Sequence, residues 1–396
     1  MAYLDIRTRH KEEIIAKKTV ATHSPAERAF LVEIGRKGAR DGWLAEDSLE
    51  ELAQLARTAG AEVVGGLVQH LTRPSPQHYI GRGKLEEVAA LKGEVGYDVV
   101  IFGDELSPLQ QRNIEEALQV KVIDRATLIL DIFARRAHTR EGQLQVELAQ
   151  HQYLLPRLAG RWSHLERLGG GIGTRGPGET QIETDRRLIR KRILRLKADI
   201  EEVRRHRALY RQQRKKRGIP VVAIVGYTNA GKSTLLNTLS KANVPVEDKL
   251  FATLDPTARR LSLPNRQVVV LTDTVGLIHK LPATLVAAFR ATLEELAEAD
   301  LLLHIIDISH KNAPEQSQVV EQILGELGLE SKPRILVLNK LDLLPGIEER
   351  ELASRELEDK GWGVVFISAA RGWRLDRLLE RIAAALAPAA SSQVVM

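Results

Sequence analysis

Hydrophobic and polar positions alternate in two rhythms over the first third of the chain. Short runs of apolar and β-branched residues are typical of buried strands, whereas the segments between them repeat apolar residues with the spacing of amphipathic helices. The strands are predicted at 30–34, 62–71, 98–102 and 122–123, and the helices at 49–59, at 83–92, from Ser107 onward and at 125–135. This alternation predicts a small parallel α/β domain over residues 1–137, of which 1–22 are expected to be flexible.

Residues 138–217 follow a different pattern, in which apolar positions recur at steps of three and four. This spacing places one narrow apolar seam on each of two helices and predicts that they pair as an antiparallel hairpin. The seam positions are Leu144, Leu148, His151, Leu155 and Leu158 in the first helix and Ile189, Ile193, Leu196, Ile200, Val203 and Tyr210 in the second.

The two helices are joined by Gly169 to Gly178, which holds six glycines in ten positions. Ordering so many glycines costs much backbone entropy, so we expect a tip that is mobile in the free protein. The tip is either a plain linker or, as its place at the end of a basic hairpin favours, a probe that becomes ordered inside a partner.

An α/β pattern returns over residues 218–388, and a tail follows at 389–396. The apolar strand 221–225 leads into Gly226 to Thr234, which spells G-x-x-x-x-G-K-S, and a helical pattern follows at once. This is the context of a phosphate-binding loop, in which glycines let backbone N–H groups point at phosphate oxygens beside a helix N-terminus. We therefore expect Lys232 to reach the β and γ phosphates of a nucleoside triphosphate and Ser233 to bind Mg2+.

Three further motifs follow in order, each at the end of a predicted strand. Asp273 to Gly276 reads DTVG, where the aspartate can hold Mg2+ through water and the last N–H can meet the γ phosphate. Asn339 to Asp342 reads NKLD, and its carboxylate can accept hydrogen bonds from N1–H and the 2-amino group of guanine, which adenine does not offer. Ser368-Ala369 can present a backbone N–H to the guanine oxygen. In this order the motifs predict a GTPase domain that binds GTP and GDP.

A threonine between the phosphate loop and DTVG is expected to complete the Mg2+ shell. Thr253 is the first choice and Thr257 the second. The residue after Gly276 is Leu277, which has no hydrogen-bonding group to orient an attacking water, so we expect slow intrinsic hydrolysis that a binding partner accelerates. Lys232, Thr253 and Gly276 are the candidate catalytic residues.

The candidate metal ligands are Ser233, Thr253 and, through water, Asp273. The candidate nucleotide-binding residues occupy the phosphate loop, the threonine loop (residues 251–255) and the three later motifs. They are Gly226, Tyr227, Thr228, Asn229, Ala230, Gly231, Lys232, Ser233, Thr234, Phe251, Ala252, Thr253, Leu254, Asp255, Asp273, Thr274, Val275, Gly276, Asn339, Lys340, Leu341, Asp342, Ser368, Ala369 and Ala370. His304, inside an apolar run, is expected to be a buried core histidine rather than a catalytic base.

Composition narrows the class of protein. A length of 396 residues suggests two or three domains. The absence of cysteine excludes disulfides, thiolate metal sites and a cysteine nucleophile, and it fits a reducing compartment. Neither the charged start, Met1 to Lys18, nor any apolar run suits a signal peptide or a membrane span, so we expect a cytoplasmic protein with no integral membrane association.

Charge is spread unevenly along the chain. The net charge is +6, yet Arg186 to Arg217 alone contains fifteen Lys or Arg residues and three acids. An excess of one sign without aromatic anchors favours RNA phosphates over a membrane, and a solvated helix face is the alternative. Tyr79 to Lys84 is a weaker signal, and a plain strand-to-helix turn is favoured there over a second nucleotide or RNA contact.

Over about residues 25–388 the chain resembles the HflX GTPases. The resemblance rests on motifs spread along the sequence, of which GPGETQ and FATLDPT are the most specific within GTPases. They are Tyr79-Ile80-Gly81-Arg82-Gly83-Lys84, Asp104-Glu105-Leu106-Ser107-Pro108, Val122-Ile123-Asp124-Arg125, Leu144-Gln145-Val146-Glu147-Leu148-Ala149-Gln150, Gly176-Pro177-Gly178-Glu179-Thr180-Gln181, Gly226 to Thr234, Phe251 to Thr257 and Asp273 to Gly276.

The resemblance implies an N-terminal α/β domain, a helical hairpin and a Ras-like P-loop GTPase domain. It also implies binding to the large (50S) ribosomal subunit, splitting or rescue of stalled ribosomes under stress, and GTP hydrolysis stimulated by the ribosome. In this family the hairpin tip reaches ribosomal RNA, which agrees with the basic helix, and the N-terminal part of some members has been linked to ATP binding or RNA remodelling. Members more often carry Phe where this chain has Leu277, and some have a further domain where little sequence follows Ala387.

Three functions remain open on the sequence alone. A GTP-controlled ribosome factor is favoured. The others are an RNA-remodelling enzyme driven from the N-terminal region and a GTP-gated adaptor for a protein partner. We expect the chain to be a monomer.

Overall fold

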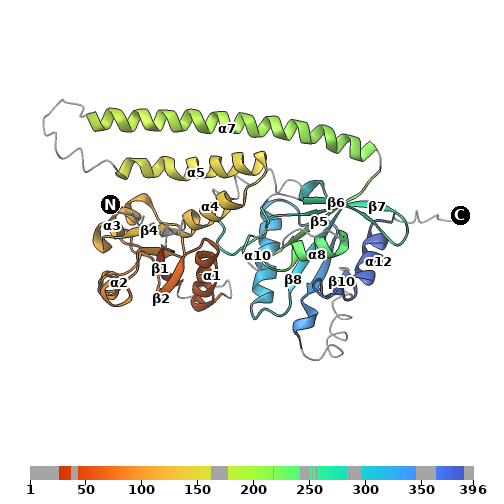
Figure 1. The fold of residues 1–396 in the computed structure, drawn as a ribbon, viewed down its shortest axis with the longest axis horizontal. Coiled ribbons are helices and arrows are strands. Elements are labelled where there is room, and N and C mark those ends of the chain that lie inside the picture. Colours follow the sequence, from red (N-terminus) through yellow and green to blue (C-terminus); the bar gives the residue numbers. More distant parts are fainter. Residues whose placement is uncertain are drawn as a thin grey trace, which may run out of the picture.

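The computed structural model describes residues 26–36, 43–161, 177–216, 218–240, 250–251, 253–254, 257–282, 285, 296–344 and 363–387. Two mainly parallel sheets, each flanked by helices, and a long helical hairpin make up these residues (Figure 1). Within the described ranges, no helix is both long and apolar enough to cross a membrane.

The first sheet has four parallel strands in the order β2-β1-β3-β4. The predicted alternation of strands and helices is confirmed, with ends shifted by a few residues, and α3 begins with the predicted capping box of Ser107 and Gln110. The elements in chain order are β1 (Arg28–Arg36), α1 (Ala45–Thr58), β2 (Glu62–Leu71), α2 (Arg82–Val95), β3 (Val99–Phe102), α3 (Pro108–Leu118), β4 (Lys121–Asp124) and α4 (Arg125–Arg136).

Side chains along β1 alternate between two apolar layers, as the period of a strand requires. Phe30 and Val32 pack in one layer, and Leu31 packs in the other with residues of α1 and α4. The second layer continues into the C-terminal half of the chain, where Phe133 of α4 meets Phe251 edge to face with ring centroids 4.7 Å apart. The two halves therefore share one apolar contact region.

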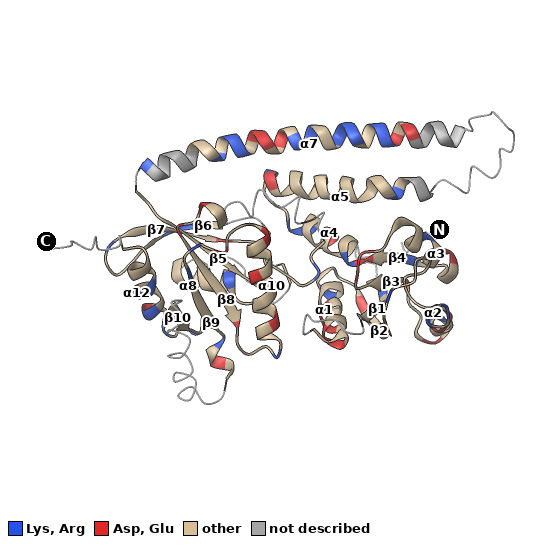
Figure 2. Cartoon of the chain, turned by 180° about the vertical axis from the view of Figure 1, so that it is seen from behind, with Lys and Arg blue, Asp and Glu red and all other residues tan. Residues whose placement is uncertain are grey.

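The hairpin consists of α5 (Arg140–Arg161) and α7 (Pro177–Lys216), which lie side by side in Figures 1 and 2. The predicted apolar seam is confirmed at its centre by a cluster of buried and half-buried residues. They are Leu148, Ile193, Leu196 and Ile200, with Leu144, Leu155 and Ile189 beside them. The predicted tip is shorter than expected because α7 already begins at Pro177, and its remaining residues, 169–176, lie outside the described ranges, as does the side chain of Tyr210.

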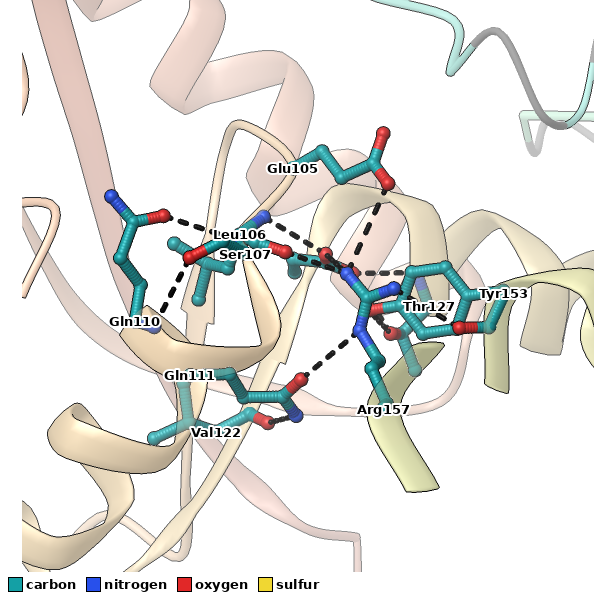
Figure 3. A network of polar contacts seen from close by, with 10 residues as sticks. Glu105, Leu106, Ser107, Gln110, Gln111, Val122, Thr127, Tyr153 and Arg157 are labelled. Atoms are coloured by element: carbon teal, nitrogen blue, oxygen red, sulfur yellow. Dashed lines mark hydrogen bonds and ion pairs between the residues drawn. The ribbon is translucent and has the colours of Figure 1, made fainter. Parts of the chain in front are cut away.

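Polar contacts attach α5 to the N-terminal sheet (Figure 3). The Arg157 guanidinium donates to the Leu106 carbonyl at 2.6 Å, lies 3.3 Å from Asp124 Oδ2 and stacks over the Tyr153 ring at 3.4 Å from its centroid. Asp124 also accepts from the N–H of Thr127 at 2.9 Å, which caps α4. One carboxylate therefore both starts α4 and holds the first helix of the hairpin.

The second sheet has six strands in the order β10-β9-β8-β5-β7-β6, and β6 alone runs antiparallel to its neighbour. The loops that follow β5, β7, β9 and β10 meet at one edge because parallel strands all end on the same side. Its elements are β5 (Val221–Gly226), α8 (Lys232–Ser240), β6 (Thr257–Ser262), β7 (Val268–Asp273), β8 (Leu301–Asp307), α10 (Ala313–Glu326), β9 (Arg334–Asn339), a 3-10 turn (Leu341–Leu343), β10 (Gly363–Phe366) and α12 (Leu375–Ala385).

The seam generates a stability prediction for two leucines two residues apart on α7. Leu196 is 0% exposed and Leu194 is 68% exposed. Leu196→Ala should lower the free energy of opening of the hairpin by about 2–4 kcal/mol because it leaves a cavity in the seam, whereas Leu194→Ala should change it little. Native-state hydrogen exchange of α5 and α7 measures both. Equal effects would mean that the seam does not hold the hairpin together.

Candidate nucleotide site

Close backbone approaches fix the phosphate loop, Gly226 to Thr234. A Cβ at Gly226 would lie 2.4 Å from the Ile305 carbonyl oxygen, and a Cβ at Gly231 would lie 2.3 Å from Asn339 Nδ2. Gly231 also has a φ of +92°, a conformation that side chains other than glycine rarely adopt. Both glycines are therefore required for this loop to pack between β8 and the NKLD motif.

Lys232 and Asp273 are buried in the same site. The Nζ of Lys232 donates to the Tyr227 carbonyl at 2.7 Å. Burial lowers the pKa of Lys232 to about 8, and the charge of Asp273 opposes this shift. Burial likewise raises the pKa of Asp273, against the effect of Lys232. A polyphosphate bound beside Lys232 would favour its charged form.

Three oxygens from separate segments converge beside the phosphate loop. The Ser233 hydroxyl donates to Asp273 Oδ2 at 2.6 Å and lies 2.7 Å from Thr253 Oγ1. Thr257, the second choice for this role, instead begins β6 and pairs with Asp273 across the strand ladder. Oxygen ligands suit Mg2+, and the described residues hold no cluster of three His, Cys, Asp or Glu that could bind a metal differently.

The DTVG loop, residues 273–280, lies directly against the phosphate loop. The N–H of Thr228 donates to the Leu277 carbonyl at 2.8 Å, and the N–H of Leu277 donates to the Gly226 carbonyl at 3.2 Å. A Cβ at Gly276 would lie 2.9 Å from Thr228 Cα and 3.2 Å from Lys232 Nζ. The Leu277 side chain is buried and brings no polar group to the site.

The NKLD and SA motifs are bonded to each other and to the phosphate loop. Asn339 donates to the Ala230 carbonyl at 2.8 Å and accepts from the N–H of Ala369 at 2.9 Å. The Ser368 hydroxyl donates to Asp342 Oδ1 at 2.6 Å. This fixes the Asp342 carboxylate next to the loop that would surround a base.

Most of the predicted site residues are thus brought together, with two qualifications. Ala252 and Asp255 lie outside the described residues. The side chains of Phe251 and Leu254 are buried in the shared apolar core, so these residues face the site only with their backbone. His304 is a core histidine as predicted, 1% exposed, with Nδ1 3.1 Å from Glu321 Oε1.

Sequence reasoning missed the residues of the N-terminal domain that border the site. A pocket of about 160 Å³ is lined by Tyr227 and Asn229 of the phosphate loop and by Asp47 and Glu50 of α1. A buried acid of the same helix, Glu51, contacts the Tyr227 hydroxyl. Glu51 is a charged residue on the buried face of α1, and such a placement is the signal that could have indicated this contact.

The motif Tyr79 to Lys84 has the contacts of a turn. Gly81 caps α2, and its N–H donates to Gln69 Oε1 at 3.0 Å. The Tyr79 hydroxyl donates to Asp104. These contacts fit the strand-to-helix turn that the sequence favoured.

Comparison with known proteins agrees with this geometry. Family models described as GTP-binding GTPase N-terminal, GTP-binding GTPase middle region and 50S ribosome-binding GTPase match residues 46–134, 136–214 and 221–340. A protein named GTPase HflX from Caldanaerobacter subterraneus subsp. tengcongensis is 56% identical over 340 residues, which cover 85% of this chain and 76% of that protein. GTPase HflX from Escherichia coli is 45% identical over 360 residues, covering 91% and 83%. A crystal structure of a complex of SsGBP with GDP matches with a TM-score of 0.50 and 26% identity, covering 91% of this chain and 98% of that one.

The contact at Gly276 generates a prediction about nucleotide binding. Gly276→Ala should push the DTVG loop away from Thr228 and Lys232, where it would meet a γ phosphate. We expect binding of a non-hydrolysable GTP analogue to weaken by about 2 kcal/mol, or roughly thirtyfold, and binding of GDP to weaken less. Calorimetric titration with both nucleotides measures this.

The matched control is Gly83→Ala on α2, where an added Cβ meets nothing within 4 Å. It should leave both affinities unchanged. An equal loss of GDP and GTP-analogue binding in Gly276→Ala would contradict the role of this close approach.

Proposed function

Because the chain belongs to the HflX family of GTPases, we propose that it binds the large ribosomal subunit in the cytoplasm and splits or rescues stalled ribosomes, especially under stress. The chain is a GTPase, which binds GTP and hydrolyses it to GDP and phosphate. The observation that carries the ribosomal part of the proposal is a long basic helix, α7, which ends at Lys216, just before β5 of the GTPase domain begins at Val221.

Residue roles in the proposed site follow from its contacts. The Ser233 and Thr253 hydroxyls would hold Mg2+, with Asp273 contributing through water, and the ion would supply positive charge to the phosphate oxygens. Lys232 and the N–H of Gly276 would bind the γ phosphate. The convergence of three oxygens supports the metal site, because Ser233 Oγ lies 2.7 Å from Thr253 Oγ1 and 2.6 Å from Asp273 Oδ2.

Hydrolysis by the isolated chain should be slow because no polar side chain follows Gly276. Leu277 is 1% exposed and buried against the phosphate loop. An attacking water therefore receives no orientation from this position. Acceleration by the ribosomal partner fits a switch, in which GTP is retained until the target is bound.

The basic arm, defined as α7 with the tip 169–176, is the proposed contact with ribosomal RNA. Figure 2 shows Lys and Arg along much of α7, with one group of acids near the middle of the helix and another close to its start. Among the described side chains, ion pairs join Arg192 to Glu147, Arg204 to Glu201 and Arg207 to Glu141. Others are exposed to solvent, namely Arg187, Arg190, Lys191, Arg195, Lys197 and Arg205.

Guanine recognition gives the first test. Asp342→Asn removes the carboxylate that would accept hydrogen bonds from N1–H and the 2-amino group of guanine. The new amide instead presents an N–H where guanine also has a donor. We expect GDP affinity to fall by roughly 3 kcal/mol, or about a hundredfold, and affinity for xanthosine diphosphate to rise, because xanthine has an oxygen in place of the amino group. Fluorescence titration measures both. Asp376→Asn, at an exposed acid on α12, is the control and should change neither.

The basic arm gives the second test. Replacing Arg187, Arg190 and Lys191 with Gln should weaken co-sedimentation with large ribosomal subunits in the presence of a GTP analogue, and should reduce the slope of log K against log salt by about one per lost phosphate contact. Binding by the unchanged protein should be stronger with the analogue than with GDP.

The matched control removes negative charge from the same helix. Glu201→Gln with Glu202→Gln should keep or strengthen subunit binding. If the basic variant binds as well as the unchanged protein and salt has little effect, the chain is a GTP-gated adaptor for a protein. ATP-dependent unwinding of RNA that survives Lys232→Ala would instead favour an RNA-remodelling enzyme.

A further inference from the structure

A buried polar cluster connects the phosphate loop and the DTVG loop to the N-terminal domain. The hydroxyl of Tyr227 donates to Glu51 of α1 and accepts from the backbone N–H of His279 at 2.8 Å. Glu51 is also paired with Arg125, the first residue of α4, and Arg125 Nη2 donates to the His279 carbonyl at 2.8 Å. Both backbone polar groups of His279 are therefore bound by side chains of other segments.

The next residue of the DTVG loop is bound to the same domain. Lys280 Nζ lies 2.6 Å from Glu33 Oε1 and 2.9 Å from Asp104 Oδ1. Burial raises the pKa of Glu33, and Lys280 opposes this shift. The indole of Trp43 stacks on the His279 ring, with centroids 4.7 Å apart and planes 3° apart. Four separate parts of the N-terminal domain thus hold two consecutive residues.

Burying the charged groups of this cluster costs hydration free energy, so the cluster is a poor source of stability. Arg125 is 1% exposed and Glu33 is 0% exposed. Within the described ranges, Nε and Nη1 of Arg125 and Oε2 of Glu33 are buried without a hydrogen-bond partner. Buried charges repay their lost hydration only in well-satisfied geometry, and water can satisfy them once the domains separate. Such a contact specifies one arrangement of the domains more than it stabilises the fold.

This arrangement coincides with closed nucleotide loops. Tyr227 belongs to the phosphate loop, and His279 lies three residues beyond Gly276, which would meet a γ phosphate. In the same structure Thr253 Oγ1 lies 2.7 Å from Ser233 Oγ, as shared ligation of one Mg2+ would require. The threonine loop also touches α4, since Phe251 packs on Phe133. One helix, α4, therefore contacts both loops that respond to a γ phosphate.

We propose that this cluster makes the position of the N-terminal domain depend on the γ phosphate, with Tyr227, Glu51 and Arg125 as positioning residues. GTP, by holding the DTVG loop against the phosphate loop, completes the cluster, and a complete cluster in turn favours GTP over GDP, since such coupling is reciprocal. Asp124, the neighbour of Arg125, holds Arg157 of α5, so the first helix of the hairpin is attached to the same domain. The inference requires GTP binding but not the ribosomal role.

Tyr227→Phe tests the proposal because it keeps the ring and removes the hydroxyl that joins Glu51 to His279. The affinities of the full-length chain for GDP and for a non-hydrolysable GTP analogue are measured by calorimetry. The ratio of analogue affinity to GDP affinity should fall about tenfold. A role in folding alone would alter both affinities together and leave the ratio unchanged.

Tyr97→Phe is the matched control. Its hydroxyl is also buried and donates to the Val88 carbonyl at 2.8 Å, inside the N-terminal domain. The affinity ratio should not change in this variant. An unchanged ratio in Tyr227→Phe, or the same fall in Tyr97→Phe, would overturn the proposal.

Hydrogen exchange provides a readout that does not depend on nucleotide affinity. At saturating nucleotide, α1 of the unchanged protein should exchange more slowly with the GTP analogue than with GDP. Tyr227→Phe and Glu51→Gln should each abolish this difference, and the double variant should add little, because both remove the same contact. A difference that persists in Tyr227→Phe would show that α1 does not respond through this cluster.

Discussion

The whole site depends on how closely backbone segments approach at the carboxyl edge of the second sheet. Gly226 lies against the Ile305 carbonyl, and Gly231 lies against the Asn339 side chain, at separations that leave no room for a Cβ. Because the phosphate loop is held this tightly between β8 and the NKLD motif, the position of the phosphates also fixes the position of the base. The motifs that bind the two ends of the nucleotide are consequently bonded to one another before any ligand contributes.

The same edge of the first sheet is used differently. Residues at the carboxyl edge of the sheet bind the ligand in many open parallel α/β folds. Here Glu33 and Asp104 bind Lys280 of the DTVG loop, and Asp124 binds Arg157 of the hairpin. The polar residues at this edge of the N-terminal domain therefore make contacts within the chain, to the GTPase domain on one side and to α5 of the hairpin on the other.

Local patterns were enough to predict most of the fold and much of the site. The strands of both sheets follow from short apolar runs, and the seam at Leu196 follows from spacing alone. The residues that form a phosphate loop are close together in sequence, so the local motif is enough to predict the loop. Contacts between distant segments leave no such trace. In the sequence, Glu33 is a single acid in an apolar strand and Lys280 is a single basic residue in a loop. Only the three-dimensional structure shows that they form an ion pair.

Helix α4 combines two contacts with different physical behaviour. At its first turn, Arg125 meets the DTVG loop through hydrogen bonds and charge, which are directional and are lost over a small displacement. Two turns later, Phe133 meets Phe251 of the threonine loop through an apolar contact, which tolerates sliding. The two contacts on α4 therefore differ in how much displacement between the domains they tolerate. Because Asp124 both caps α4 and holds Arg157, the first helix of the hairpin is attached at the polar end of α4.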